Sequence, residues 1–270
     1  MSELVMIDFE DNGYFTYPNP IETIAHDKGL NNDSMSWLHV FAETHEGNFE
    51  SIIRLFEYFP KIKSPRLRKT FAELLGDAGS IPCIDFIRLK IKDTENPLSV
   101  SSTLLFASVI AEVGMLSDIP LLLETYLKLR QHKDSDIIPI WISDLMESDP
   151  DEFCEPSAYI NIKDYSTNVM NHYTTLVAEL GSAEVYIFEG ALFDVNKLAQ
   201  LMIKRLISDD FLPEYRQRFE ASTGINCSDF YKAGLLQPLN AAAILENFID
   251  DPGSARFKEG VRYFFGHRIT

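Results

Sequence analysis

The sequence has few cysteines, and they are not arranged to hold a metal ion or to form a redox pair. Cys83, Cys154 and Cys227 are far apart, and no CxxC spacing occurs. A zinc knuckle or a thiol–disulfide centre needs closely spaced cysteines. The sequence therefore predicts free thiols, as in proteins of a reducing compartment.

Long hydrophobic runs and secretion signals are also lacking. No apolar run reaches the roughly 18 residues that are needed to span a bilayer. Residues 1–8 contain acids and no base, whereas a signal peptide begins with a basic region. We therefore expect a cytoplasmic protein that does not enter a membrane.

The common motifs of catalytic sites are missing as well. The chain contains no HExxH, GxSxG, Walker A or GxGxxG motif. His39 and His45 are six residues apart, a spacing that does not place two ligands on one face of a helix. The sequence therefore predicts no catalytic residues, no metal ion and no cofactor, and we expect that the protein is not an enzyme.

Positive charge is scarce in this chain. The sequence has 24 basic and 41 acidic residues, and its formal charge is −17. Such a charge repels a phosphate backbone, so we expect no binding to nucleic acid. It attracts a basic protein and speeds the encounter with it. The alternative is that the acidity only keeps the protein soluble.

Apolar residues at helical spacing predict a series of helices separated by Gly, Pro, Asn or Ser. The first six form three pairs: 36–43 with 48–59, 65–75 with 81–91, and 99–113 with 118–130. Further helices are expected at 164–180, 194–207, 212–223 and 240–249. The segment 158–162 fits either a short strand or an extended linker, and 184–188 fits either a strand or the start of another helix.

A short internal similarity indicates a repeat. Leu75-Gly76 is followed by Ile81-Pro82, and 38 residues later Val113-Gly114 is followed by Ile119-Pro120. Ala178-Glu179-Leu180-Gly181 repeats the glycine pattern of residues 111–114. We expect each glycine to end one helix in a left-handed conformation and each proline to lie in the first turn of the next helix.

These observations predict a mostly α fold of HEAT- or armadillo-like hairpins, because a period near 40 with two helices is typical of those repeats. The hairpins are expected at 36–147 as a short solenoid, after an irregular segment at 1–35. A less regular helical cap, with room for short strands, is expected at 148–270 and packed as one continuous domain with the hairpins. Residues 99–113 are apolar nearly all round and should form a buried helix.

One stretch of the chain is strongly acidic. Residues 134–162 contain eight acids and neither Lys nor Arg, with aromatic residues alongside. Aromatic anchors beside charged groups are typical of tight protein interfaces. The candidate partner-binding residues are Glu147, Asp149, Asp151, Glu152, Glu155, Tyr159 and Tyr165. An acidic surface loop without a partner is the alternative.

The C-terminal sequence resembles a known family over about 50 residues. Residues 223–231 (TGINCSDFY), 236–243 (LQPLNAAA) and 260–269 (GVRYFFGHRI) are similar to the ending of HEAT-repeat-like immunity proteins. These proteins belong to bacterial contact-dependent growth inhibition and related polymorphic toxin systems.

The resemblance implies a cytoplasmic protein, monomeric before binding, that binds a cognate toxin domain and covers its active site. Many such toxins are basic nucleases, including EndoU-type ribonucleases, and an acidic protein suits such a partner. The family supplies no catalytic residues that could be transferred to this sequence. A HEAT-like scaffold or adaptor for cellular proteins is the alternative. A HEAT-like DNA glycosylase would need a basic groove, and the overall charge of the chain argues against one.

Overall fold

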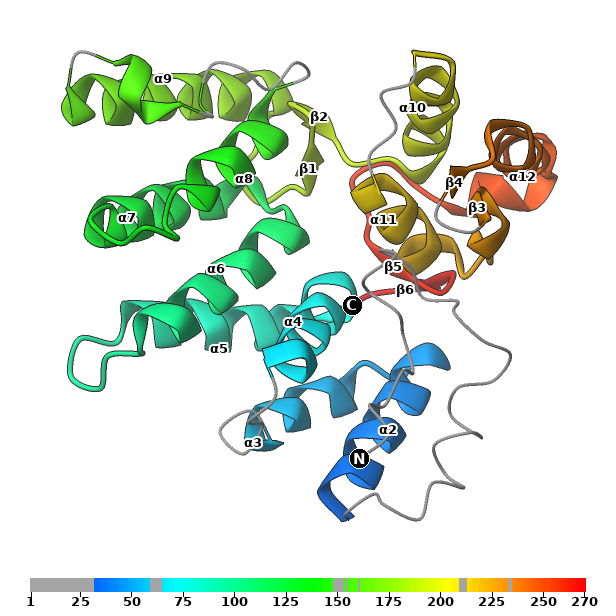
Figure 1. Cartoon of the computed structure of the whole chain (residues 1–270), viewed down its shortest axis with the longest axis horizontal. Coiled ribbons are helices and arrows are strands. Elements are labelled where there is room, and N and C mark those ends of the chain that lie inside the picture. Colours follow the sequence, from blue (N-terminus) through cyan, green and yellow to red (C-terminus); the bar gives the residue numbers. More distant parts are fainter. Residues whose placement is uncertain are drawn as a thin grey trace. The chain divides into compact units, whose positions relative to one another are not determined.

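The computed structural model of the chain consists mostly of helices with a few short strands (Figure 1), as the sequence predicts. It describes residues 32–58, 65–147, 153, 155–159, 161–208, 213–232 and 235–270. Most of the segment 1–35 therefore lies outside the described residues. The chain divides into two compact units: unit 1 comprises Met1–Phe71 and Asp194–Thr270, and unit 2 comprises Ala72–Phe193. The expected parts 36–147 and 148–270 stay a prediction.

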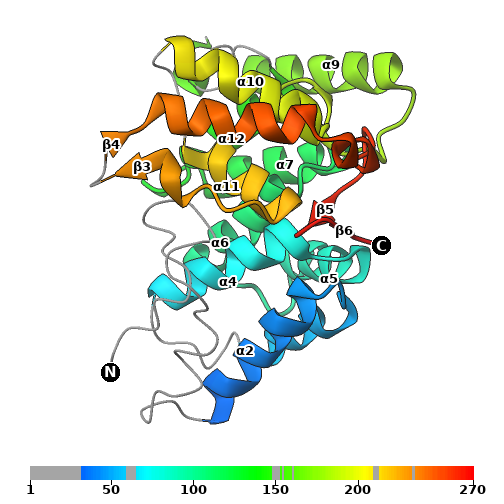
Figure 2. The same cartoon turned by 90° about the vertical axis from the view of Figure 1, so that its right-hand side faces the viewer.

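Unit 1 contains helices from both ends of the chain. Its N-terminal part consists of α2 (Asn32–His45), η2 (Glu50–Arg54), α3 (Leu55–Tyr58) and the first half of α4 (Pro65–Ala78). Its C-terminal helices are α10 (Val195–Ser208), α11 (Pro213–Thr223), η6 (Ser228–Phe230), α12 (Pro238–Asp250) and η7 (Pro252–Arg256). Helix α10 packs on α11 and on α12 (Figure 2).

Two small hairpins complete the C-terminal part of unit 1. They are β3 (Tyr231–Lys232) with β4 (Leu235–Leu236), and β5 (Tyr263–Phe264) with β6 (His267–Arg268). Phe264 is fully buried and Tyr263 is nearly so. The backbone N–H of Phe265 donates to the carbonyl of Ala221 at 2.6 Å, so the second hairpin is fixed to the end of α11.

Unit 2 is a succession of helices in which each contacts the next. The helices are α5 (Ile81–Lys92), α6 (Val100–Val113), η4 (Leu116–Asp118), α7 (Ile119–Leu129), α8 (Ile137–Met146), η5 (Pro156–Ala158) and α9 (Ile162–Leu180). Helices α6 and α8 also touch each other, as do α7 and α9. The hairpin β1 (Ile187–Phe188) with β2 (Ala191–Leu192) follows, and β1 packs on α8.

The expectation for the glycines holds at two positions and is wrong at the third. Gly114 ends α6 with φ +69° and Gly181 ends α9 with φ +76°, both in the left-handed region. Gly76 instead lies inside α4, which continues to Ala78. A Cβ at Gly76 would lie 2.6 Å from Cβ of Glu112. This glycine therefore allows α4 and α6 to approach closely, and it does not end a helix.

The prolines and the central helix agree with the sequence. Pro82 and Pro120 lie in the first turns of α5 and α7, where the missing N–H costs no hydrogen bond. Ser99 caps α6, because its hydroxyl accepts a hydrogen bond from the backbone N–H of Ser102 at 3.2 Å. Val109 of α6 is only 1% exposed, so this helix is buried as expected.

Other expectations need correction or refinement. No helix was expected at 137–146, where α8 lies. The described residues of 158–162 contain no strand, since the 3-10 turn η5 ends at Ala158 and α9 begins at Ile162. In 184–188, only residues 187 and 188 form a strand.

Candidate protein-binding surface

The acidic stretch lies between α8 and α9, and its first residue is not at the surface. Glu147 is buried, and its carboxylate accepts hydrogen bonds from the hydroxyl of Ser143 and from the backbone N–H of Phe153 (3.4 Å). The side chain of Glu147 therefore holds the end of α8 to the chain six residues later. Asp149, Asp151 and Glu152 lie outside the described residues.

Phe153 fixes the middle of the stretch to α9. Its ring is 1% exposed and lies edge-on to the ring of His172, with centroids 5.4 Å apart. The hydroxyl of Tyr165 is 3.3 Å from the carbonyl oxygen of Phe153, to which it donates. Nε2 of His172 lies 3.1 Å from the carbonyl oxygen of Met146. Residues on both sides of Asp149 are thus tied to the same helix.

Three tyrosines from different elements form a cluster beside this stretch. The ring centroid of Tyr165 lies 5.7 Å from that of Tyr126 and 5.3 Å from that of Tyr159, and both pairs are edge-to-face. Tyr165 is fully buried at the centre of this tyrosine cluster, and Tyr159 is half-buried. The amide of Asn168 donates to the Tyr159 hydroxyl at 2.9 Å, which positions the ring that reaches the surface.

One exposed acid lies near Tyr126, and another precedes Tyr159 in the sequence. Burial and the nearby carboxylate of Asp136 both raise the pKa of Tyr126, with burial the larger cause. Asp134 and Asp136 are exposed in the connection before α8, and Glu155 is exposed four residues before Tyr159. The fold therefore brings the carboxylate of Asp136 close enough to Tyr126 to raise its pKa, and the nearby Arg130 opposes that effect.

The candidate residues thus fall into three groups. Glu147 and Tyr165 are buried and hold the fold together, so the structure removes them from the exposed surface. Glu155 and Tyr159 do reach it. For these two and for the undescribed Asp149, Asp151 and Glu152, a role in binding stays a prediction.

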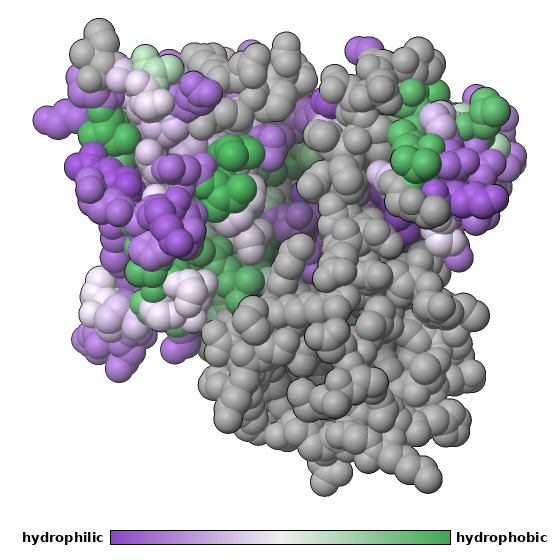
Figure 3. All heavy atoms as spheres, in the orientation of Figure 1, coloured by the Kyte–Doolittle hydropathy of each residue, from purple (hydrophilic) through white to green (hydrophobic). Residues whose placement is uncertain are grey.

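The acidic charge is concentrated in unit 2. Ala72–Phe193 contains 20 acidic and 7 basic residues, a formal charge of −13, whereas Asp194–Thr270 contains 10 of each. Figure 3 shows hydrophilic side chains gathered over α7 and α9 of unit 2. The stretch 134–162, with its eight acids and neither Lys nor Arg, supplies most of that charge, so the sequence alone had located the main source of it.

Two buried ion pairs serve the fold. Nε of Arg88 lies 2.7 Å from Oδ1 of Asp118, and this contact ties α5 to η4. Nη1 of Arg88 lies 2.8 Å from Oδ1 of Asp85 on the same helix. Burial raises the pKa of Asp118, and Arg88 opposes that shift. In unit 1, Nε of Arg216 lies 3.2 Å from Oε1 of Glu220, which also accepts from the backbone N–H of Cys227 at 2.8 Å.

The two cysteines that the structure describes are not reactive, and Cys154 lies outside the described residues. Cys83 and Cys227 are free and buried. Burial raises the pKa of both thiols, and it places that of Cys227 well above its ordinary value. A thiol in this state is a poor nucleophile. Within the described residues, no three His, Cys, Asp or Glu side chains come together as a metal site would require.

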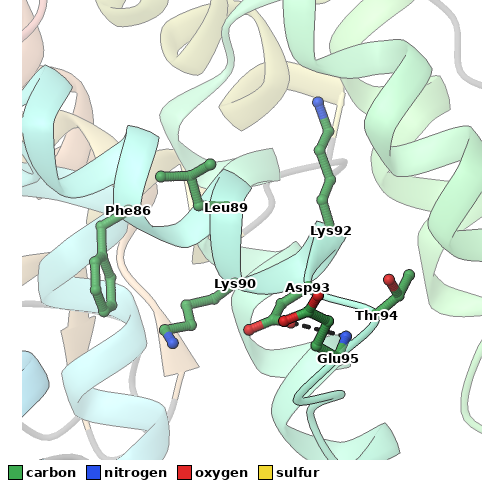
Figure 4. A pocket seen from close by; sticks show the side chains of 7 residues that line it. All are labelled: Phe86, Leu89, Lys90, Lys92, Asp93, Thr94 and Glu95. Carbon is green, nitrogen blue, oxygen red and sulfur yellow. Dashed lines mark hydrogen bonds between the residues drawn. The ribbon is translucent and has the colours of Figure 1, made fainter.

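A shallow hollow of about 520 Å³ lies at the end of α5 (Figure 4). Its lining is Phe86, Leu89, Lys90, Lys92, Asp93, Thr94 and Glu95. The ammonium of Lys90 lies over the ring of Phe86, and the carboxylate of Asp93 accepts from the backbone N–H groups of Glu95 and Asn96. These side chains therefore stabilise one another, and they present no paired nucleophile and base.

A scan against models of protein families finds no match to this chain, and comparisons with curated proteins and with solved structures find none either. Among the described helices, none is both long enough and apolar enough to span a membrane.

Proposed function

We propose that the protein binds a basic protein domain through the acidic surface of unit 2 and covers the active site of that domain. It would act as an immunity protein, like the family that its C-terminal sequence resembles. The observation that carries the proposal is the concentration of charge: unit 2 has a formal charge of −13, and exposed acids precede both α8 and Tyr159. The free protein is a cytoplasmic monomer in this proposal.

A nuclease is the class of partner that this surface suits best. The active site of a nuclease must hold phosphate, so it presents positive charge. A carboxylate-rich surface occupies that charge without offering a bond to be cut. The aromatic ring of Tyr159 among the acids provides the apolar contact that charge alone does not supply. An EndoU-type ribonuclease is one partner of this kind.

The proposal includes a HEAT-like stacking of unit 2. In stacked hairpins every helix contacts the next helix and also the corresponding helix of the adjacent hairpin. The contacts of α6 with α8 and of α7 with α9 follow that pattern, in addition to the contacts between successive helices. Such a stack would present a wide surface to a partner. A scaffold for cellular proteins would use the same stack, and the two functions differ in whether the partner is toxic.

The test uses the protein domain encoded directly upstream of this gene, since an immunity gene follows its toxin. Production of that domain should stop growth, and co-production of this chain should restore it. Association is then measured with a variant carrying Asp134→Lys, Asp136→Lys and Glu155→Lys. Its matched control carries Asp229→Lys, Glu246→Lys and Asp250→Lys, all exposed in the neutral segment 194–270. Both variants have the same net charge.

The acid-surface variant should associate at least about tenfold more slowly at low salt, because steering depends on local charge. The control should change the rate much less. The difference should shrink at high salt, where charges are screened beyond a few ångströms. Equal rates for the two variants would show that only net charge matters and would overturn the proposed surface. A non-toxic upstream domain would favour the scaffold.

A further inference from the structure

Helix α8 has an outer face that is mostly apolar. Helical spacing places Ile137, Ile140, Trp141 and Asp144 on one side of α8. Ile137 is 38% exposed, Ile140 is 39% exposed and Trp141 is half-buried. The opposite side carries the core residues of the helix, Ile138, Ile142, Leu145 and Met146, which are all buried.

This apolar face is only partly covered within unit 2. The inner side of α8 already packs against α6, α7, α9 and β1. Two partly exposed isoleucines and a tryptophan within two turns leave apolar area in contact with water, which is unfavourable unless a partner covers it. Figure 3 shows hydrophobic side chains at the surface over α6 and α8. Tryptophan is also the residue type most enriched at the centre of protein interfaces.

Acids border the α8 face at both ends. Asp134 and Asp136 precede the helix, and Asp144 lies in its last turn. All three are exposed. A carboxylate near the start of a helix is stabilised by the helix dipole, but one in the last turn is not. Asp144 gains nothing from the helix dipole, and it adds an exposed carboxylate at the far end of the face.

We infer that the α8 face binds an amphipathic basic helix of the partner protein, with apolar residues over Ile137, Ile140 and Trp141 and with Lys or Arg beside the acids. The inference rests on the proposed function, because it assigns the docking element on the same acidic unit. An apolar stripe with basic flanks matches both features of the face, whereas a purely basic loop would leave the isoleucines uncovered. An acidic partner would be repelled by Asp136 and Asp144.

The experiment uses Trp141 as its reporter. The chain has two tryptophans, so Trp37→Phe leaves Trp141 as the only one in the full-length protein. The probe is a labelled synthetic peptide of about 18 residues, or five helical turns, with leucines on one helical stripe and lysines elsewhere. A scrambled peptide of the same composition has the same charge but no stripe. Peptide anisotropy reports binding, and acrylamide quenching reports whether Trp141 is covered.

The striped peptide should bind at least about tenfold more tightly than the scrambled one and should reduce quenching of Trp141 about twofold, because apolar burial adds to charge. A variant with Ile137→Ser and Ile140→Ser should lose about tenfold in affinity. Its matched control is Ile81→Ser, at an isoleucine of unit 2 that is also 38% exposed. The control should bind as the parent does.

Five outcomes would overturn the inference. Unchanged quenching of Trp141 at saturation would place the peptide elsewhere. An equal loss of peptide affinity in the α8 variant and in Ile81→Ser would show that the loss is not specific to the α8 face. A dimer of the free protein that the α8 variant dissociates would show that a second copy covers the face. If both peptides bind equally through the acids, the α8 site fails while the acidic surface stands; if neither binds, the proposed function fails too.

Discussion

Unit 2 and the C-terminal segment 194–270 of unit 1 differ most clearly in charge. The former has a formal charge of −13 and the latter is neutral. A coat of acids that served only solubility would be expected on both. The proposed binding surface lies on the unit that carries most of the acid, where a basic partner would be attracted most strongly.

The two regions also use their buried arginines differently. The side chain of Arg88 in unit 2 is 20% exposed and contacts two carboxylates, those of Asp85 and Asp118. The side chain of Arg216 in unit 1 is 3% exposed and pairs with Glu220, which is fully buried. Removal of either Arg216 or Glu220 should therefore destabilise the protein more than removal of Asp118, because water cannot reach the remaining buried charge.

The largest effect is expected from a charge in the core of unit 2. Val109→Asp places an unpaired carboxylate in α6 and should destabilise the protein by about 5 kcal/mol or more. Hydrogen exchange should show that residues 81–180 lose protection while 194–270, which has its own core, retains it. The exposed position Ser101 of the same helix supplies the control, Ser101→Asp, which should melt like the parent. An unchanged melting temperature for Val109→Asp would contradict the observed burial.

The reverse experiment disturbs the C-terminal segment and spares unit 2. Deletion of residues 260–270 removes Tyr263 and fully buried Phe264, and the loss of their burial should cost about 4 kcal/mol. Phe257, whose ring centroid lies 5.0 Å from that of Tyr263, would become exposed, so dye binding to apolar surface should rise. Full stability of the truncated chain would mean that the hairpin β5–β6 serves a partner and not the fold.

The two ion pairs provide a third comparison. Glu220→Gln leaves buried Arg216 without its carboxylate and should cost about 3 kcal/mol or more. Asp118→Asn should cost about 1 kcal/mol, because Arg88 is partly exposed and keeps Asp85. Urea denaturation measures both values. A larger loss for Asp118→Asn would reverse the ranking of the two pairs.

Local signals in the sequence were sufficient for most helices. Ser99 before an apolar run and Pro82 at a helix start predicted α6 and α5 to within a residue or two, because capping and proline geometry are local. The prediction that Gly76 ends a helix was wrong, since a glycine that allows two helices to approach has the same local sequence as one that ends a helix. Only the position of Glu112 distinguishes the two cases.

The candidate site was harder to predict. No helix was predicted at 137–146, although Pro139 lies in the first turn of α8, where a proline is tolerated. Tyr165 was assigned to the surface because it lies near acids in the sequence. Its helical spacing with Val169 and Leu176, both buried, could have indicated the core. The approach of Asp136 to Tyr126 depends on tertiary packing, so no local pattern contains it.

The smallest predicted effect concerns a histidine of unit 1. The ring of His45 lies 3.9 Å from that of Phe265. Burial lowers the pKa of His45, and nearby His267 lowers it further, while Glu46 opposes the shift. The unfolded chain therefore binds a proton at His45 more readily than the folded chain does. The stability that depends on neutral His45 is present above about pH 6.5, the ordinary histidine pKa, and is lost as the pH falls through the lowered value.

His45→Gln should consequently reduce the loss of stability between pH 7 and pH 5, which urea denaturation at several pH values would measure. His39→Gln is the control, since the side chain of His39 is 67% exposed and belongs to the same helix. Because Phe265 belongs to the turn between β5 and β6, the acid effect should be absent after deletion of residues 260–270. A pH dependence that survives both the substitution and the deletion would show that groups other than His45 cause the acid sensitivity.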